Sequence, residues 1–341
     1  MAEALTCGHG AVRGMTASPR EPAAWLRLPV LLLALAAGAA WLVLPHSLSF
    51  PGSAPEQQRA RSSRILAGKW ADFSGNLPGK VVFARPPQML CLDLASGVER
   101  MVPGVEVAGA PGRRLRGGSP RPFWAPDGSR FAYRFANRVY VCDEAGSRRL
   151  VSNSRMDCSD ETRWSWHRRQ GKDWLAGPSV EGDVILVSVE DPGLVRTAYG
   201  GGNVKKHCEI TGSGRFIVYD DGSCIRVTRF GGRERGITIS SGQSCRPCAA
   251  ADDRAAWLPS PHDRYRIFTA DSGRFLGDLL APPGEEIYRL NWSNLPDFAV
   301  HAHFAGAAPR THVRKASTPA ALLTRSGWDP DLWIGTPPEV R

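Results

Sequence analysis

The sequence predicts an all-β fold, a six-bladed β-propeller, preceded by an N-terminal transmembrane helix. After residue 70 a unit of about 40–45 residues with several short apolar strands repeats, which is the period of propeller blades. Turns rich in Gly and Pro separate those strands, and the chain contains 36 Gly and 27 Pro. One uncharged apolar run stands near the N-terminus, ahead of the repeats.

The apolar run is Leu28–Leu44, LPVLLLALAAGAAWLVL, which holds 17 residues and no charge. A helix of this length, rising 1.5 Å per residue, is just long enough to cross a hydrocarbon core of roughly 30 Å. We therefore expect residues 1–27 to be a cytoplasmic tail and 28–44 a transmembrane helix or signal anchor. Residues 45–64 then form an exported linker, and 65–341 form the propeller.

The alternative for this run is a cleaved signal peptide with a long n-region, or one that starts at Met15. We favour an uncleaved anchor because the run exceeds a usual h-region and no clean small-x-small site follows it. Arg13, Arg20 and Arg27 precede the run, which places the N-terminus inside. The propeller is thus expected in the periplasm or outside the cell.

The repeat is clearest in the second strand of each unit. These strands begin at Val81, Phe131, Trp174, Phe216, Ala255 and Phe298, at intervals of 50, 43, 42, 39 and 43 residues. Third strands follow five of them, as MLCLDL, VYVCD, VILVSV, CIRVTRF and YRIFTA. Six starts indicate six blades of four strands each, between about residues 65 and 335.

The most complete unit is Phe123–Asn153, FWAPDGSRFAYRFANRVYVCDEAGSRRLVSN. Its Asp127-Gly128 pair is a strong signal for a tight turn, because Gly reaches positive φ without steric cost. We expect these two residues to join the first two strands of blade two as a structural device, and not as a ligand site. Phe131, Tyr133 and Phe135 then alternate at the period of a strand.

A propeller also needs a strand that closes the ring, because closure removes most exposed sheet edges. The candidates for that strand are Leu332–Ile334 near the C-terminus and the stretch Arg64–Phe73. No long amphipathic helical pattern follows residue 50. We therefore expect no helix longer than ~12 residues there.

The motifs of blade two resemble a known family. Trp124–Gly128 (WAPDG) and the later VYVCDEAGSRRL are similar to the W-S-P-D-G and I-Y-x-x-D-x-x-G-x-x-x-x-L elements of TolB-like, WD-type propeller repeats. The full pattern stands in one blade, with weaker forms in Gly212–Tyr219 and Asp252–Trp257. The resemblance implies a periplasmic or extracellular propeller that binds proteins or ligands. In some relatives the fold carries enzymes, including lyases.

The net charge of +10 is spread along the chain. Residues 1–70 hold seven Arg and Lys against three Glu, and the remainder carries Arg in scattered pairs. A nucleic-acid surface would concentrate basic residues on one element and interleave them with aromatic ones. We therefore expect solvated arginines and no nucleic-acid partner.

The cysteines suggest a disulfide and little else. Cys158, Cys208 and Cys248 occupy nearly the same place in three successive units, near the slot that borders a propeller's channel, where they would pair or bind a soft metal. Cys245 and Cys248 have C-x-x-C spacing but lack the βαβ context of a redox dithiol. We expect small buried residues with some disulfide pairing.

His301 and His303 are two residues apart on an expected strand and so share one face. They are weak candidates for a metal site, with His207 or His167 as a third ligand. No carboxylate accompanies them at a recognisable spacing, and no motif for an organic cofactor is present. We expect no cofactor.

These observations favour a membrane-anchored extracytoplasmic binding or scaffolding module, and not an enzyme. Its partner would be a protein or a carbohydrate, recognised by loops around one channel mouth. Most of the 11 Trp should fill the spaces between blades, with one or two left at a mouth for sugar or peptide. The alternatives are a metal-dependent, lyase-like enzyme acting on polysaccharide, and an inert structural module.

Overall fold

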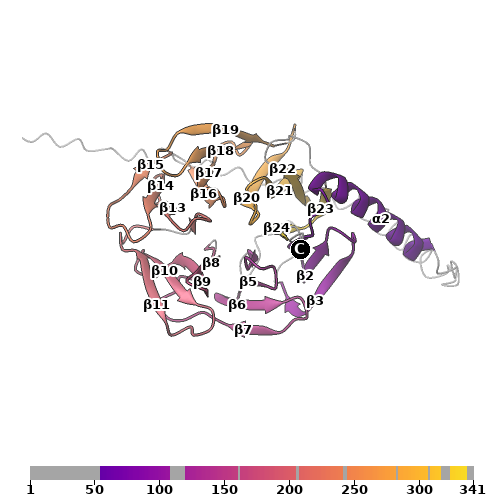
Figure 1. Ribbon diagram of the computed structural model, residues 1–341, viewed down its shortest axis with the longest axis horizontal. Coiled ribbons are helices and arrows are strands. Elements are labelled where there is room, and N and C mark those ends of the chain that lie inside the picture. The colour runs from indigo at the N-terminus through magenta and orange to yellow at the C-terminus, as the bar shows by residue number, and fades with distance from the viewer. Residues whose placement is uncertain are drawn as a thin grey trace, which may run out of the picture. The chain divides into compact units, whose positions relative to one another are not determined.

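The computed structural model describes residues 54–107, 120–159, 162–204, 207–240, 244–281, 283–305, 308–315 and 323–335. Residues Gln57–Arg341 form one compact unit. The described residues of this unit contain six four-stranded antiparallel sheets, which lie around a common centre (Figure 1). The prediction of six blades is therefore confirmed.

Each blade is a meander in which neighbouring strands are hydrogen-bonded in order from the centre outward. Blades one to three consist of β24 (Trp328–Ile334), β1 (Gly79–Arg85), β2 (Gln88–Asp93) and β3 (Glu99–Glu106); β4 (Phe123–Trp124), β5 (Arg130–Phe135), β6 (Arg138–Asp143) and β7 (Arg148–Leu150); β8 (Ser165–Arg169), β9 (Lys172–Pro178), β10 (Val184–Ser188) and β11 (Val195–Tyr199). Blades four to six consist of β12 (Cys208–Ile210), β13 (Phe216–Asp220), β14 (Ile225–Arg229) and β15 (Ile237–Thr238); β16 (Ser244–Ala249), β17 (Arg254–Pro259), β18 (Arg264–Thr269) and β19 (Phe275–Leu280); β20 (Glu286–Trp292), β21 (Phe298–Ala305), β22 (Ala308–Lys315) and β23 (Leu323–Ser326).

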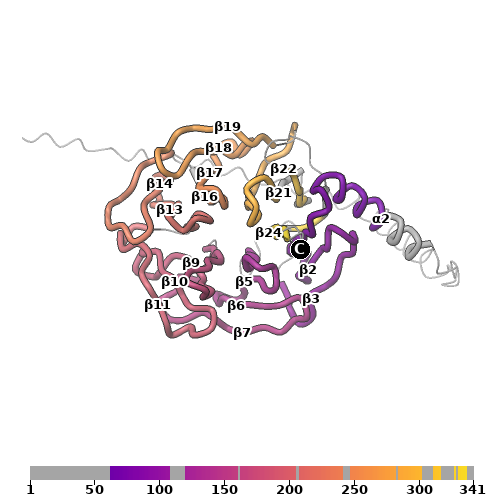
Figure 2. The backbone as a smooth tube through the Cα atoms, viewed as in Figure 1, coloured from indigo at the N-terminus to yellow at the C-terminus, as the bar shows by residue number. Residues whose placement is uncertain are grey.

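All six second strands lie where the repeat predicted them. The predicted starts fall within β1, β5, β9, β13, β17 and β21, and the five predicted third strands correspond to β2, β6, β10, β14 and β18. The backbone tube passes from one blade to the next around the ring (Figure 2). Apolar period and turn spacing were therefore sufficient to locate the blades.

The ring is closed by the C-terminal strand. β24 pairs antiparallel with β1, with Leu332 opposite Val81 and Trp333 opposite Lys80. The closing strand predicted at Leu332–Ile334 is confirmed. Blade one thus combines a C-terminal strand with three N-terminal ones, so that the two ends of the propeller are held in one sheet.

The other closing candidate, Arg64–Phe73, is wrong, and so is the expectation of no long helix after residue 50. That stretch belongs to α2 (Ala54–Ser74), a helix of 21 residues. It also takes up residues 54–64 of the stretch expected to be a linker. Leu66, Trp70 and Phe73 are spaced by four and three residues, which places them on one helical face.

The apolar face of α2 packs on blades one and six. Leu66 and Trp70 are buried in one cluster with Val81 and Phe298. Trp70 donates its indole N–H to the carbonyl of Leu77 at 2.6 Å. The helix ends at Ser74. The next residue, Gly75, has a left-handed φ of 68°, and its N–H donates to the carbonyl of Ala71. From Gln57 onward the helix therefore belongs to the folded unit.

The core is divided among the junctions between blades. Each of the six junctions between neighbouring blades has a cluster of buried apolar side chains among the described residues. Side chains alternate between the two faces of each sheet, so that Phe131 and Tyr133 pack toward blade one while Ala132 packs toward blade three. Tryptophans fill five of the junctions outside α2: Trp124, Trp164, Trp166, Trp174, Trp257 and Trp292.

The described residues include no helix with the length and apolar character needed to cross a membrane. The span predicted at 28–44 and the tail at 1–27 lie outside the described residues.

Candidate functional site

The central channel opens at one end into a pocket built by all six blades. The innermost strands of all six blades run in the same direction, so that their C-terminal ends lie at the same end of the central channel. Residues at these ends enclose a pocket of about 430 Å³. Each blade contributes at least one lining residue, for example Ala125, His167, Thr211, Ala250, Ser293 and Leu332. Small-ligand sites typically enclose roughly 300–1,000 Å³. We call this the mouth pocket.

Aromatic side chains form much of its wall. Trp124, Trp166, Trp292 and Trp333 line the mouth pocket, and the first three are also wedged between blades. Trp333 donates its indole N–H to the carbonyl of Pro126 at 2.9 Å. The indole N–H groups of Trp124 and Trp166 are buried and have no hydrogen-bond partner among the described residues. The wall is therefore mostly apolar, and its tryptophans are held in place by the packing between blades.

Charged groups are few in this wall. Arg168 and Asp331 are the charged residues that line the mouth pocket within the described parts of the chain. His167 also lines it, and burial lowers its pKa to about 4. That histidine is consequently neutral at pH 7. The electrostatics of the pocket thus depend on how Arg168 and Asp331 are partnered.

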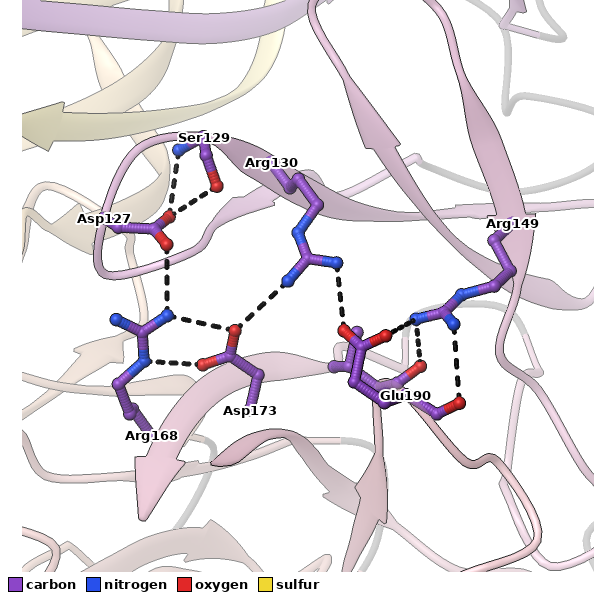
Figure 3. Close-up of polar contacts among 8 residues, drawn as sticks. Asp127, Ser129, Arg130, Arg149, Arg168, Asp173 and Glu190 are labelled. Atoms are coloured by element: carbon purple, nitrogen blue, oxygen red, sulfur yellow. Dashed lines mark hydrogen bonds and ion pairs between the residues drawn. The ribbon is translucent and has the colours of Figure 1, made fainter. Parts of the chain in front are cut away.

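Arg168 is already satisfied by two carboxylates, as Figure 3 shows. Its Nε and Nη2 donate to the two oxygens of Asp173 at 2.7 and 3.0 Å, and Nη2 also reaches Asp127 at 3.1 Å. Asp173 accepts in turn from Arg130, which pairs with Glu190. This chain of ion pairs ties the rim of blade two to blade three.

The Asp127-Gly128 turn lies at this rim, where it connects β4 and β5. The N–H of Gly128 bonds the carbonyl of Ala125, and Gly128 has φ of 67°. Although partial burial opposes ionisation, hydrogen bonds from Ser129 and Arg168 hold the pKa of Asp127 below its usual value. The turn also supports the mouth, because Trp333 packs directly on Gly128.

Asp331 has fewer hydrogen bonds than Arg168. It is 2% exposed, and one of its two carboxylate oxygens accepts a hydrogen bond. Its Oδ2 accepts the backbone N–H of Trp124 at 2.7 Å. Its Oδ1 lies 3.7 Å from Arg163 Nη2 and has no hydrogen-bond partner among the described residues. Burial raises the pKa of Asp331 to about 7, against the opposing effect of Arg163.

Further charged side chains lie on the innermost strands, or just before them, next to Asp331. Arg163 and Glu209, 3% and 4% exposed, form an ion pair. Glu209 also accepts the backbone N–H of Ala249 at 2.8 Å. Arg289 lies 3.8 Å from Asp329, and burial together with the charge of Arg163 lowers the pKa of Arg289 to about 9. Each of these two arginines has a carboxylate of its own.

A second group of cations lies at the N-terminal ends of the innermost strands, away from the mouth pocket. Arg121, just before β4, has its Nη1 3.5 Å from Nδ1 of His207, and burial lowers its pKa to about 10. Arg246 donates to the carbonyl of Tyr288 at 2.6 Å and stacks on its ring. The pKa of His207 is well below its usual value because of burial and the nearby arginines. The channel is therefore more basic at this end.

This polar channel was missed from the sequence, and the expectation of solvated arginines is wrong for Arg121, Arg163 and Arg289, which are buried. Each charge stands alone in its repeat, and about one repeat length of sequence or more separates it from its partner. Glu209, Arg289 and Asp329 follow one another at about one or two repeat lengths. An alignment of the repeats that compared their polar residues would have revealed these channel charges.

The three aligned cysteines are not brought together. Cys158, Cys208 and Cys248 are buried free thiols in three different interblade clusters, so no disulfide joins them. Burial raises the pKa of Cys158 to about 11 and that of Cys208 well above its usual value. Cys245 lies with Cys248 on β16, but its side chain is outside the described part of the structure. The three cysteines do not occupy equivalent positions in their blades, because Cys158 precedes β8 instead of lying on it.

The two candidate metal ligands, His301 and His303, lie on β21, the second strand of blade six. His301 is buried and stacks on His312 of the neighbouring strand, with ring centroids 5.5 Å apart. His207 and His167 belong to blades four and three, and the side chain of His303 lies outside the described part of the structure. No group of three or more His, Cys, Asp or Glu residues suited to a metal occurs among the described residues.

No protein-family model and no curated protein matches the chain. Solved structures do match. TolB from Acinetobacter baumannii shares 15% identity at a TM-score of 0.54, over 84% of this chain and 74% of that one. A TolB structure from Agrobacterium tumefaciens shares 12% at 0.53, over 77% and 100%. A chain of the nidogen/laminin complex shares 9% at 0.53, over 76% and 98%. The chain has the TolB-like propeller fold.

Proposed function

We propose that this protein is a binding module that holds a segment of a protein partner in the mouth pocket. The observation that carries the proposal is the pocket of about 430 Å³ to which every blade contributes. Its wall is fixed by interblade tryptophans, while its edge is made of turns between strands. A rigid frame that presents turns around a cavity is a common arrangement for recognition.

The similar structures agree with a protein partner. One of them is a chain of a complex between two proteins, nidogen and laminin. The mouth pocket also matches what a peptide needs, because it combines the apolar rings of tryptophans with polar side chains in one wall. Polar side chains of this kind bind the backbone groups of an extended segment. Capture of a carbohydrate instead of a protein is an outcome that the following experiment separates.

Filling the mouth pocket should abolish partner capture. Ala251 lies in the turn after β16, is half-buried and lines the pocket. We expect Ala251→Trp in the full-length protein to reduce the cross-linked partner recovered from native membranes by about tenfold or more, a loss of about 1.4 kcal/mol. The readout is quantitative mass spectrometry of the cross-linked material, with and without glycosidase treatment.

The matched control is Val180→Trp. Val180 is 62% exposed and lies in the turn between β9 and β10, at the end of blade three opposite the mouth pocket. This variant should capture as the wild type does. Equal capture by both variants at unchanged melting temperature would refute binding at the mouth, and glycosidase-sensitive capture would make the partner a carbohydrate.

We further propose that residues 28–44 anchor the chain and that the propeller lies outside the cytoplasm. The uncharged length of the run and the three preceding arginines support this arrangement. N-terminal sequencing of the mature protein should find a start before residue 28, and protease added to intact cells or spheroplasts should reach residues after 45. A mature start after residue 35 would show that the run is cleaved.

A further inference from the structure

The mouth pocket has one incompletely bonded charge in its wall. Arg168 is held by Asp127 and Asp173, and the low pKa of His167 leaves it neutral. The carboxylate of Asp331 keeps an oxygen, Oδ1, with no hydrogen-bond partner among the described residues. The nearest cation, Arg163, lies 3.7 Å from this oxygen, beyond hydrogen-bond distance. Such incomplete pairing of a buried carboxylate is costly, so its surroundings favour a ligand that brings positive charge.

We propose that the mouth pocket binds a basic side chain of the protein partner, an arginine or a lysine, and that Asp331 pairs with its charged group. This inference rests on the proposed function and adds the chemistry of the bound segment. The side chain enters between the tryptophan walls, so that its aliphatic stem lies on apolar surface while its charge reaches the carboxylate. Asp331 is then the specificity-determining residue of the site.

The neighbouring arginines do not reverse the sign of the site. Arg163 is the cation nearest to Asp331, but it is paired with Glu209. Arg289 lies beside Asp329. Arg121 and Arg246 belong to the opposite end of the innermost strands, where they contact His207 and Tyr288. In the wall itself the unbonded charge is negative, which favours a cation over a carboxylate or a phosphate.

The uptake of a cation should depend on pH. Asp331 must be ionised to pair with it, and the groups that surround Asp331 are Arg163, Glu209, Arg289 and Asp329. The raised pKa of Asp331, about 7, means that the carboxyl is mostly protonated below neutrality. Affinity should therefore increase about tenfold from about pH 6 to about pH 8 and then level off.

The test uses the full-length protein in detergent and two probes that differ in charge alone. N-acetyl-arginine methylamide carries a guanidinium, and N-acetyl-citrulline methylamide has nearly the same shape without charge. Binding is followed by the fluorescence of the tryptophans that line the pocket. We expect saturable binding of the arginine probe, about tenfold weaker binding of the citrulline probe, and a similar loss for the arginine probe with Asp331→Asn.

Asp331→Asn keeps an oxygen for the N–H of Trp124, so the fold should be retained, and the melting temperature verifies this. In this variant the pH dependence should disappear. Asp278→Asn, an outer-strand carboxylate on β19, serves as control and should bind as the wild type does. Equal binding of both probes, no saturable change with either, or an unaltered affinity in a folded Asp331→Asn would overturn the proposal.

The two proposals fail in different ways. If Ala251→Trp abolishes capture while Asp331→Asn leaves both capture and probe binding unchanged, the mouth binds its partner through other chemistry. If Ala251→Trp leaves capture unchanged, the proposed function itself is wrong. A probe with a glutamate side chain that binds better than the arginine probe would assign the site to an anionic segment.

Discussion

Replacing Gly128 by valine should lower the melting temperature of the protein by about 10 °C. Gly128 has φ of +67°, a region that a β-branched residue enters at a cost of about 1–3 kcal/mol. A Cβ atom there would also lie 2.4 Å from the indole ring of Trp333 on the closing strand. Forcing that ring aside should cost about 1–3 kcal/mol more. Each kcal/mol corresponds to roughly 2–4 °C for a domain of this size.

Gly171→Val separates the two contributions. Gly171 has nearly the same φ, +70°, but no atom lies within 4 Å of the position that its Cβ would take. This variant should lose only the part due to backbone strain, about half of the effect at Gly128. Thermal unfolding followed by circular dichroism measures both. Equal losses would show that Trp333 yields to the valine without cost, and that the closing strand is not held by this contact.

The blades could be predicted from the sequence because each strand has its own pattern of alternating residues and turns. Phe131 and Tyr133 alternate with residues that face the next blade, and Asp127-Gly128 marks the turn before them. Such patterns depend on local geometry and burial alone. The closing strand at Leu332–Ile334 was predicted for the same reason, since it is an apolar run at the end of the last repeat.

The helix α2 was missed because its signal is short. Leu66, Trp70 and Phe73 form an apolar stripe over two turns, after a stretch of Gln and Arg that resembles a linker. What stabilises the helix is its contact with Phe298 and Val81, which come from distant parts of the chain. Tertiary packing outweighs a weak local pattern in such cases.

The channel charges could not be predicted as pairs, because their partners are brought together only by ring closure. Asp331 approaches Arg163 across more than 160 residues of sequence. By contrast, the cysteine and histidine candidates were chosen for their spacing in the sequence. The structure places Cys158, Cys208 and Cys248 in separate clusters and His301 on β21, the second strand of blade six.

Replacing Glu209 by leucine should destabilise the propeller by about 3–5 kcal/mol, or about 6–20 °C in melting temperature. The variant leaves Arg163 buried at 3% exposure, with its hydrogen-bonded carboxylate removed and Asp331 3.7 Å away. It also leaves the N–H of Ala249, a residue of blade five, without its acceptor. Arg163 is buried, so its guanidinium keeps its desolvation cost when its acceptor is removed.

The double variant Arg163→Met/Glu209→Leu tests this explanation. Replacing a buried ion pair by apolar side chains of similar size is often neutral, because both desolvation costs disappear together. We expect the double variant to be more stable than Glu209→Leu alone, with a coupling of about 1–3 kcal/mol in a double-mutant cycle. Recovery should be incomplete, because the N–H of Ala249 stays unbonded and Phe123 loses the guanidinium that stacks on it at 4.5 Å.

Glu99→Leu supplies the surface comparison. Glu99 accepts two hydrogen bonds from Arg85, at 2.5 and 3.1 Å, but the two side chains are 28% and 38% exposed. Such a pair contributes at most about 1 kcal/mol, since solvent screens it and can replace it. If Glu99→Leu lowered the free energy of unfolding as much as Glu209→Leu, burial would not determine how much an ion pair contributes to stability. Additive effects of Arg163→Met and Glu209→Leu would show that the two groups do not stabilise one another, and that the channel is held by the interblade clusters alone.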